Sequence, residues 1–118
     1  MSRDHWNIDI DGDKLILSRN PVARFDFFVE ATLPDASRLR VAHQVRQDMW
    51  RRLQTLRGFS PVVEVERCES GLLVRAGGQI DAKRFPKRWA EKRVLALMEC
   101  PVTRQRWARF AAHREVAA

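Results

Sequence analysis

Asp9, Asp11 and Asp13 place three carboxylates within five residues of the chain. Calcium takes oxygen ligands at alternate positions of a loop, so this spacing invites comparison with a calcium-binding loop. An EF-hand loop needs glycine at its sixth position and glutamate at its twelfth, whereas Lys14 and Asn20 occupy those positions here. We therefore interpret the segment as a hairpin turn and expect no bound metal.

The histidines and cysteines also lack the spacing of a reactive site. His5, His43 and His113 are far apart, and no two of them lie at the i, i+4 spacing that zinc sites favour. We expect Cys68 and Cys100 to be buried, reduced thiols, because they are not closely spaced and nothing in the chain indicates secretion. A catalytic cysteine–histidine pair would have to form across the fold. We expect no catalytic residues and no cofactor.

Positive charge is the strongest chemical signal in the chain, whose formal net charge is +7. Residues 1–66 hold ten Lys/Arg and ten Asp/Glu, whereas residues 67–118 hold twelve and five. The whole excess therefore belongs to the second half, and such asymmetry points to an anionic partner. Arginine outnumbers lysine eighteen to four, a bias that a GC-rich coding sequence also produces. A solvated basic face with no ligand is therefore the alternative.

Six of these charges fall within residues 83–93, where Glu91 is the only acid. If this stretch is helical, Arg88 and Lys92 lie four residues apart on one face, and they repel each other unless an anion meets them. Lys and Arg bind phosphates without reading the base sequence. The candidate polyanion-binding residues are Lys83, Arg84, Lys87, Arg88, Lys92, Arg104, Arg106 and Arg109.

Known nucleic-acid motifs fit the chain poorly. The break at Cys100 and Pro101, followed by residues 103–109, resembles a helix-turn-helix, but Arg106 falls where that motif needs an apolar residue. The aromatic strand motif of RNA-recognition sheets and the Gly-x-x-Gly loop of KH domains are both missing. We interpret the aromatic residues of the basic half as packing residues rather than base-stacking platforms: Phe85, Trp89, Trp107 and Phe110.

These observations predict a small non-enzymatic protein that uses a C-terminal basic surface to bind nucleic acid or another polyanion. The alternative is an adaptor or subunit that docks on an acidic protein surface. The chain contains no apolar run long enough to cross a membrane, and its first residues do not resemble a secretory signal. We expect a cytoplasmic protein that does not bind membranes.

In the first half of the chain, apolar residues alternate with polar ones on both sides of Asp11-Gly12, which predicts a hairpin. Alternation over residues 25–31 predicts a third strand. From residue 35 to about 57 the period changes to 3.6, beginning at Leu39, and this predicts a long helix that Gly58 ends.

In the second half, a turn at residues 69–71 predicts another hairpin, which Gly77-Gly78 ends by a chain reversal rather than by forming a phosphate loop. Either Asp81 or the Phe85-Pro86 pair opens the next helix. We expect Pro101 to stop that helix and Thr103 to cap a last one, with Trp107, Phe110 and Ala111 turned inward. The tail at residues 114–118 should fray.

This order, β-β-β-α-β-β-α-α, predicts an α+β fold in one domain over residues 1–118. Short hairpins favour a mostly antiparallel sheet of about five strands, covered by helices on one face. The composition is that of an ordinary globular protein, with 45% hydrophobic and 31% charged residues.

Overall fold

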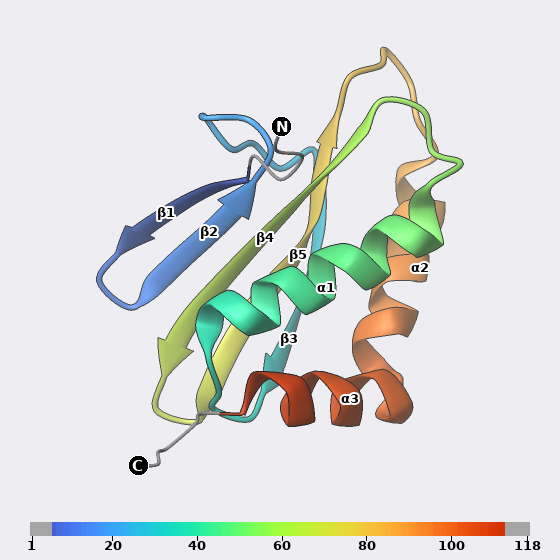
Figure 1. Ribbon diagram of the computed structural model, residues 1–118. Coiled ribbons are helices and arrows are strands. Elements are labelled where there is room, and N and C mark those ends of the chain that lie inside the picture. The colour runs from blue at the N-terminus through green and yellow to red at the C-terminus, as the bar shows by residue number, and fades with distance from the viewer. Residues whose placement is uncertain (1–5, 113–118) are drawn as a thin grey trace, which may run out of the picture.

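The computed structural model describes residues 6–112 and confirms the predicted order of strands and helices (Figure 1). The elements are β1 (Asn7–Asp11), β2 (Lys14–Ser18), β3 (Phe27–Leu33), α1 (Arg38–Leu53), β4 (Phe59–Cys68), β5 (Gly71–Ile80), α2 (Lys87–Glu99) and α3 (Pro101–Ala111). The five strands form one sheet in the order β1-β2-β4-β5-β3, and every neighbouring pair is antiparallel. The fraying expected for residues 114–118 concerns a part of the chain outside the described residues.

Both predicted hairpins are present. Two-residue turns connect β1 to β2 and β4 to β5, and Gly12 in the first turn has a φ of 63°, which glycine adopts without strain. Gly77 and Gly78 do not end the second hairpin as expected, because β5 continues through them to Ile80. Their lack of a side chain serves packing: a Cβ at Gly77 would collide with the backbone of β3, and one at Gly78 with the ring of Phe59 and the carbonyl oxygen of Ser60.

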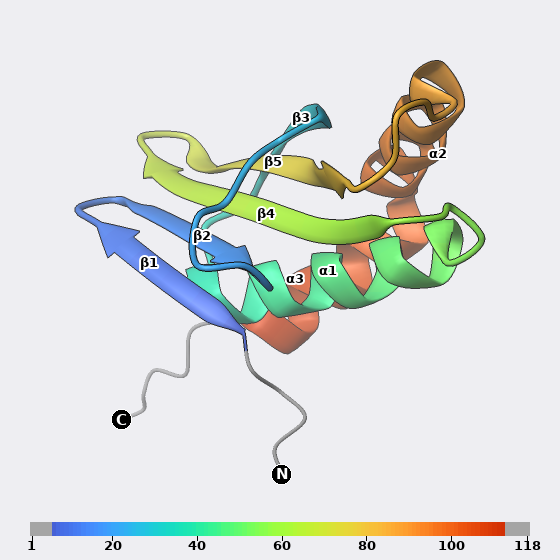
Figure 2. The same cartoon turned by 90° about the horizontal axis from the view of Figure 1, so that it is seen from above.

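All three helices lie on the same side of the sheet (Figure 2). Alternate residues of β2, β3, β4 and β5 point toward them and form the core with the inward faces of the helices, whereas β1 is exposed along its whole length. Val45 and Met49 of α1, Val94 of α2 and Trp107 of α3 are all fully buried. The three helices therefore form one layer, and their outward sides together make one face of the molecule.

Helix α1 is shorter than predicted, and its buried side is different. Ser37 caps its start, since the Ser37 hydroxyl accepts a hydrogen bond from the backbone N–H of Arg40 at 3.3 Å. Leu39 is exposed and Val41 is buried in its place, because these two residues lie about 200° apart around the helix axis. Gly58 does not cap the helix; with a φ of 75° it turns the chain toward β4.

Helices α2 and α3 meet at Cys100. Pro86 directly precedes α2. Of the two predicted starts, the Phe85-Pro86 pair is therefore the correct one. Pro101 ends α2 and is the first residue of α3. Thr103 is not the cap that we expected; its hydroxyl points back and shares its one proton between the carbonyl oxygens of Leu97 and Cys100, at 2.9 and 3.0 Å.

The inward line of α3 runs through Thr103, Trp107 and Ala111, residues four apart in the sequence. Phe110 lies to the side of this line and is 58% exposed, so the expectation that it turns inward is wrong. Phe85, in contrast, packs against the core with its ring centre 5.9 Å from that of Phe27.

Candidate polyanion-binding surface

The two faces of the molecule differ in charge. The three helices contain twelve Lys/Arg and three Asp/Glu, a net charge of +9. The register places two basic residues and five acids on the sheet face that points away from the helices, a net charge of −3. These seven are Asp9, Asp11, Lys14, Glu30, Glu64, Glu66 and Arg75. The imbalance between the halves of the sequence thus becomes an imbalance between two layers.

Helix α1 belongs to the basic layer although it comes from the neutral half of the sequence. It carries five arginines and only one acid, Asp48. The sequence analysis missed this contribution, because the acids that balance these arginines in the first half of the chain are distant in space. Five of the ten acids in residues 1–66 lie on β1, β3 and β4, on the open face of the sheet.

Five of the predicted residues form what we call the basic segment: Lys83, Arg84, Lys87, Arg88 and Lys92. All five are exposed, and within residues 6–112 none of their side chains makes a hydrogen bond or an ion pair. Arg88 and Lys92 lie on the side of α2 opposite to the buried Ala90 and Val94. Phe85 anchors the segment to the core, so its charges extend from a fixed backbone.

A hollow of about 470 Å³ lies beside the basic segment. Two arginines line it, Arg57 from the loop after α1 and Arg84 from the segment, together with the indole of Trp89. Trp89 is 39% exposed, so it is only partly the packing residue that we expected. Arg93 stacks on this indole with its Cζ 5.0 Å from the ring centre, and its Nε donates to the carbonyl oxygen of Arg52 at 3.3 Å.

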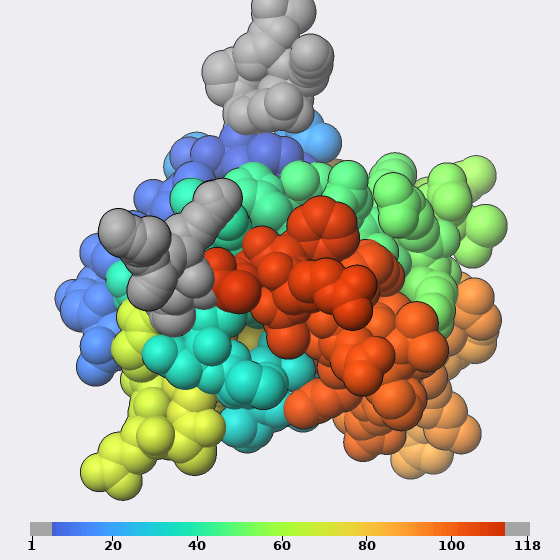
Figure 3. Space-filling model, turned by 60° about the horizontal axis from the view of Figure 1, so that its bottom comes forward, coloured from blue at the N-terminus to red at the C-terminus, as the bar shows by residue number. Residues whose placement is uncertain are grey.

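The arginines of α3 behave differently from one another. Arg104 donates hydrogen bonds to the carbonyl oxygens of Met98 and Thr32, at 2.9 and 2.7 Å, and so ties α3 to α2 and β3. Arg106 forms an ion pair with Asp48 of α1 at 2.9 Å. Of the three, only Arg109 is exposed, whereas Arg104 and Arg106 are half-buried. Figure 3 shows α3 in the middle of this face, with α1 and α2 beside it.

Asp48 organises the contact between α1 and α3, and the sequence analysis missed it. Its side chain is 7% exposed, and its Oδ2 accepts a hydrogen bond from Nε1 of the buried Trp107 at 2.7 Å. Arg106 and Arg51 pair with the same carboxylate, at 2.9 and 3.4 Å. The available signal was position: Asp48 follows the buried Val45 by three residues and therefore lies on the inward side of α1.

The cysteines are both free, but the expectation of burial is wrong for Cys68, which is exposed at the end of β4. Cys100 is half-buried at the start of α3. The pKa of its thiol is lowered, chiefly because the backbone N–H of Thr103 hydrogen-bonds to the sulfur, with a further contribution from the backbone N–H of Val102.

Within the described part of the chain, the remaining candidates for chemistry are not brought together into one site. His43 accepts a hydrogen bond from Arg46 at 3.1 Å, and His5 and His113 lie outside the described residues. Among residues 6–112, no three His, Cys, Asp or Glu side chains are grouped so that they could hold a metal ion. The same part of the chain contains no helix that is both long and apolar enough to span a bilayer.

Comparison of the chain with protein-family models, with curated proteins and with solved structures found no match.

Proposed function

We propose that this is a non-enzymatic, cytoplasmic binding protein that holds nucleic acid or another polyanion by phosphate contacts from the basic segment. The observation that supports this proposal most directly is that the basic side chains of this segment have no acidic partner within the described residues. Five neighbouring basic side chains are exposed and have no internal partner in the described part of the chain. Arg109 and Arg57 extend the positive surface, whereas Arg104 and Arg106 support the fold.

The energetics favour an anionic ligand at this place. Arg88 and Lys92 repel each other at a spacing of four residues, and a phosphate between them relieves that cost. The acidic sheet face is turned away from the helices, so the charge distribution steers a polyanion toward the helical layer. Trp89 beside Arg84 adds an aromatic surface on which an unpaired base can stack.

The salt dependence of binding tests the proposal. If the five residues neutralise about five phosphates, the logarithm of the affinity for duplex DNA falls against the logarithm of salt with a slope near −4.5. Fluorescence anisotropy with a labelled duplex measures this slope. Absence of binding at about 50 mM salt would remove the proposal.

A pair of variants with equal net charge locates the site. Arg88→Gln/Lys92→Gln removes two charges from the basic segment. The slope should become less steep by about 2, because about two fewer phosphates are neutralised. Thr32→Glu/Ser70→Glu changes the net charge by the same amount at exposed positions on β3 and the β4–β5 turn, and it should leave the slope unchanged. Equal effects of the two variants would show a response to net charge alone.

A second candidate function is docking on an acidic protein surface. The observation in its favour is an exposed apolar pair on α3, since Val102 is 71% exposed and Phe110 is 58% exposed. Both line a shallow hollow of about 260 Å³ with Arg106 and Arg109, and apolar contacts flanked by arginine suit a protein partner better than a phosphate chain. Purification of partners at physiological salt, followed by nuclease, separates the two functions. A protein partner persists, and a partner bridged by nucleic acid is lost.

A further inference from the structure

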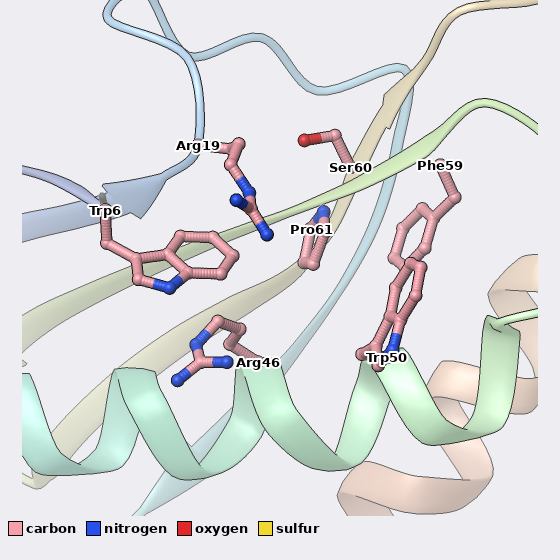
Figure 4. Close-up of a pocket in the computed structure, with 7 residues that line it drawn as sticks. All are labelled: Trp6, Arg19, Arg46, Trp50, Phe59, Ser60 and Pro61. Atoms are coloured by element: carbon pink, nitrogen blue, oxygen red, sulfur yellow. The ribbon is translucent and has the colours of Figure 1, made fainter. Parts of the chain in front are cut away.

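A second hollow, of about 250 Å³, lies between the end of the β1–β2 hairpin and the middle of α1 (Figure 4). Segments far apart in the sequence form it, so no local sequence motif predicts it. Its seven lining residues are Trp6, Arg19, Arg46, Trp50, Phe59, Ser60 and Pro61. Among the residues that the structure describes, the lining includes two guanidiniums and two indoles and no carboxylate.

Two arginines share the indole of Trp6 at one end of this hollow. The Cζ of Arg19 lies 4.7 Å from the ring centre and that of Arg46 lies 4.5 Å from it. Figure 4 shows Arg19 above the indole and Arg46 below it. Cation–π contacts hold both guanidiniums against the indole, and one Nη of Arg46 also bonds Nδ1 of His43 at 3.1 Å. Two basic side chains at this end of the hollow favour an anion over a cation there.

The other end of the hollow is aromatic and apolar. Trp50 stacks on Phe59 with ring centres 6.2 Å apart and an angle of 9° between the planes. Trp50 is nevertheless 45% exposed, which is unusual for so large an apolar ring. Pro61 lies between the two ends, and the Ser60 hydroxyl stands above it (Figure 4). A flat ring is the shape that this wall accepts.

We propose that the hollow binds a small ligand in which a planar ring carries one anionic group, a carboxylate or a phosphate. The anion lies within reach of Arg19 and Arg46, and the ring lies against Trp50 and Pro61. The volume is slightly below the usual range for drug-sized ligands, which suits a compound of one or two rings. This site shares no residue with the basic segment, so it stands or falls independently of polyanion binding.

Four probes separate the parts of the proposed ligand: uridine 5′-monophosphate, benzoate, uridine and inorganic phosphate. NMR spectra of the indole N–H groups follow Trp6 and Trp50, and the buried Trp107 serves as the internal reference for the fold. At least one of the two ring-bearing anions should shift the Trp6 and Trp50 signals saturably. Uridine and phosphate should each bind about tenfold or more weakly, because each lacks one half of the recognised group.

Two outcomes would overturn the proposal. If neither uridine monophosphate nor benzoate shifts these signals saturably below about 10 mM, the hollow is not a ligand site. If inorganic phosphate binds as tightly as the ring-bearing anions, the ring is not recognised and the site is a simple anion site. The response to the two ring-bearing anions also distinguishes a phosphate ligand from a carboxylate ligand.

Substitutions assign the binding to the hollow. Arg19→Gln, at an exposed position after β2, should weaken binding of the preferred probe about tenfold. Trp50→Leu should weaken it several-fold through loss of the aromatic wall. Arg109→Gln removes the same charge on α3, and Arg88→Gln/Lys92→Gln removes two charges from the basic segment; neither should change the affinity. Unchanged affinity in Arg19→Gln with an unshifted Trp107 signal would refute the assignment.

Discussion

The open sheet face and the helical layer both carry many charged residues, but they use them differently. On the sheet face, Arg75 lies between two acids on neighbouring strands, with its Nε 2.6 Å from Glu30 and its Nη1 in contact with Glu64. Lys14 approaches Glu64 from the other side at 4.0 Å. The basic segment has no such partners in the described residues. Charge content alone therefore does not mark a binding surface; the absence of internal compensation does.

The same distinction divides the helical layer itself. Arg106 satisfies the buried carboxylate of Asp48 and Arg104 satisfies backbone carbonyls, so their charges are already used by the fold. Arg88 and Lys92 are exposed and make no hydrogen bond or ion pair within residues 6–112. Substitutions at compensated charges should lower stability, whereas substitutions at uncompensated charges should lower binding.

The largest effect on stability is expected for Asp48→Ala. The variant leaves the buried Nε1 of Trp107 without its acceptor and Arg106 without its counter-ion. Loss of a buried, multiply bonded carboxylate should cost about 3 kcal/mol. Urea denaturation followed by tryptophan fluorescence measures the change. A loss below about 1 kcal/mol would mean that the contact between α1 and α3 does not depend on this carboxylate.

A smaller loss is expected for Arg75→Ala on the open sheet face. Glu64 is buried and loses its closest counter-ion, so the free energy of unfolding should fall by about 1.5 kcal/mol. Lys14→Ala is the matched control, because its ammonium is more exposed and farther from Glu64, and it should cost less than about 0.5 kcal/mol. If the two variants are equally stable, the ion pair between Arg75 and Glu64 does not stabilise the fold.

Asp26 provides a test by pH. Its pKa is lowered, chiefly by its hydrogen bond with Arg24 and then by the backbone N–H of Ile80, which donates to it at 2.6 Å. A lowered pKa means that the carboxylate stabilises the fold above its unfolded pKa, and that this contribution is lost as pH falls through its folded pKa. Asp26→Asn should therefore have a smaller drop in thermal midpoint below about pH 4 than the wild type. An identical drop in both proteins would contradict the assignment.

The smallest effect on stability is expected for the variant that should most affect binding. Arg88→Gln/Lys92→Gln removes a repulsive pair at a spacing of four residues, so it should change the free energy of unfolding by only a few tenths of a kcal/mol, in the stabilising direction. Thermal denaturation at low salt measures this change. A large destabilisation would show that these side chains support the fold and would blur the contrast with Arg104 and Arg106.

The fold could be predicted because its signals are local. Alternation around Asp11-Gly12 and the period of α1 are patterns within one segment. Patterns of this kind predicted all eight elements in the correct order. The errors came from contacts between distant segments. Gly77 and Gly78 resemble a chain reversal in sequence, but they are a close approach of β5 to β3 and to Phe59. Phe110 has a helical spacing compatible with burial, yet α3 places it at the edge of its packed side.

The candidate site was predictable only in part, for the same reason. The basic segment is continuous in sequence, and its composition made it visible. The partners of Arg104 and Arg106 come from β3 and α1, so no property of residues 104–106 could show that these arginines are occupied. The hollow beside Trp6 brings together four separate segments, and arginine is too common in this chain for Arg19 and Arg46 to stand out in the sequence.

The position of β3 constrains how the sheet is assembled. This strand follows β2 in the chain but lies at the opposite edge, with the β4–β5 hairpin between them. The two hairpins can form early because their pairings are local, whereas β3 must wait for a hairpin made from residues 59–80. During synthesis, no nascent chain that ends before β5 can complete the sheet, and a break at the β4–β5 turn would separate β3 from its only neighbour in the sheet among the described strands.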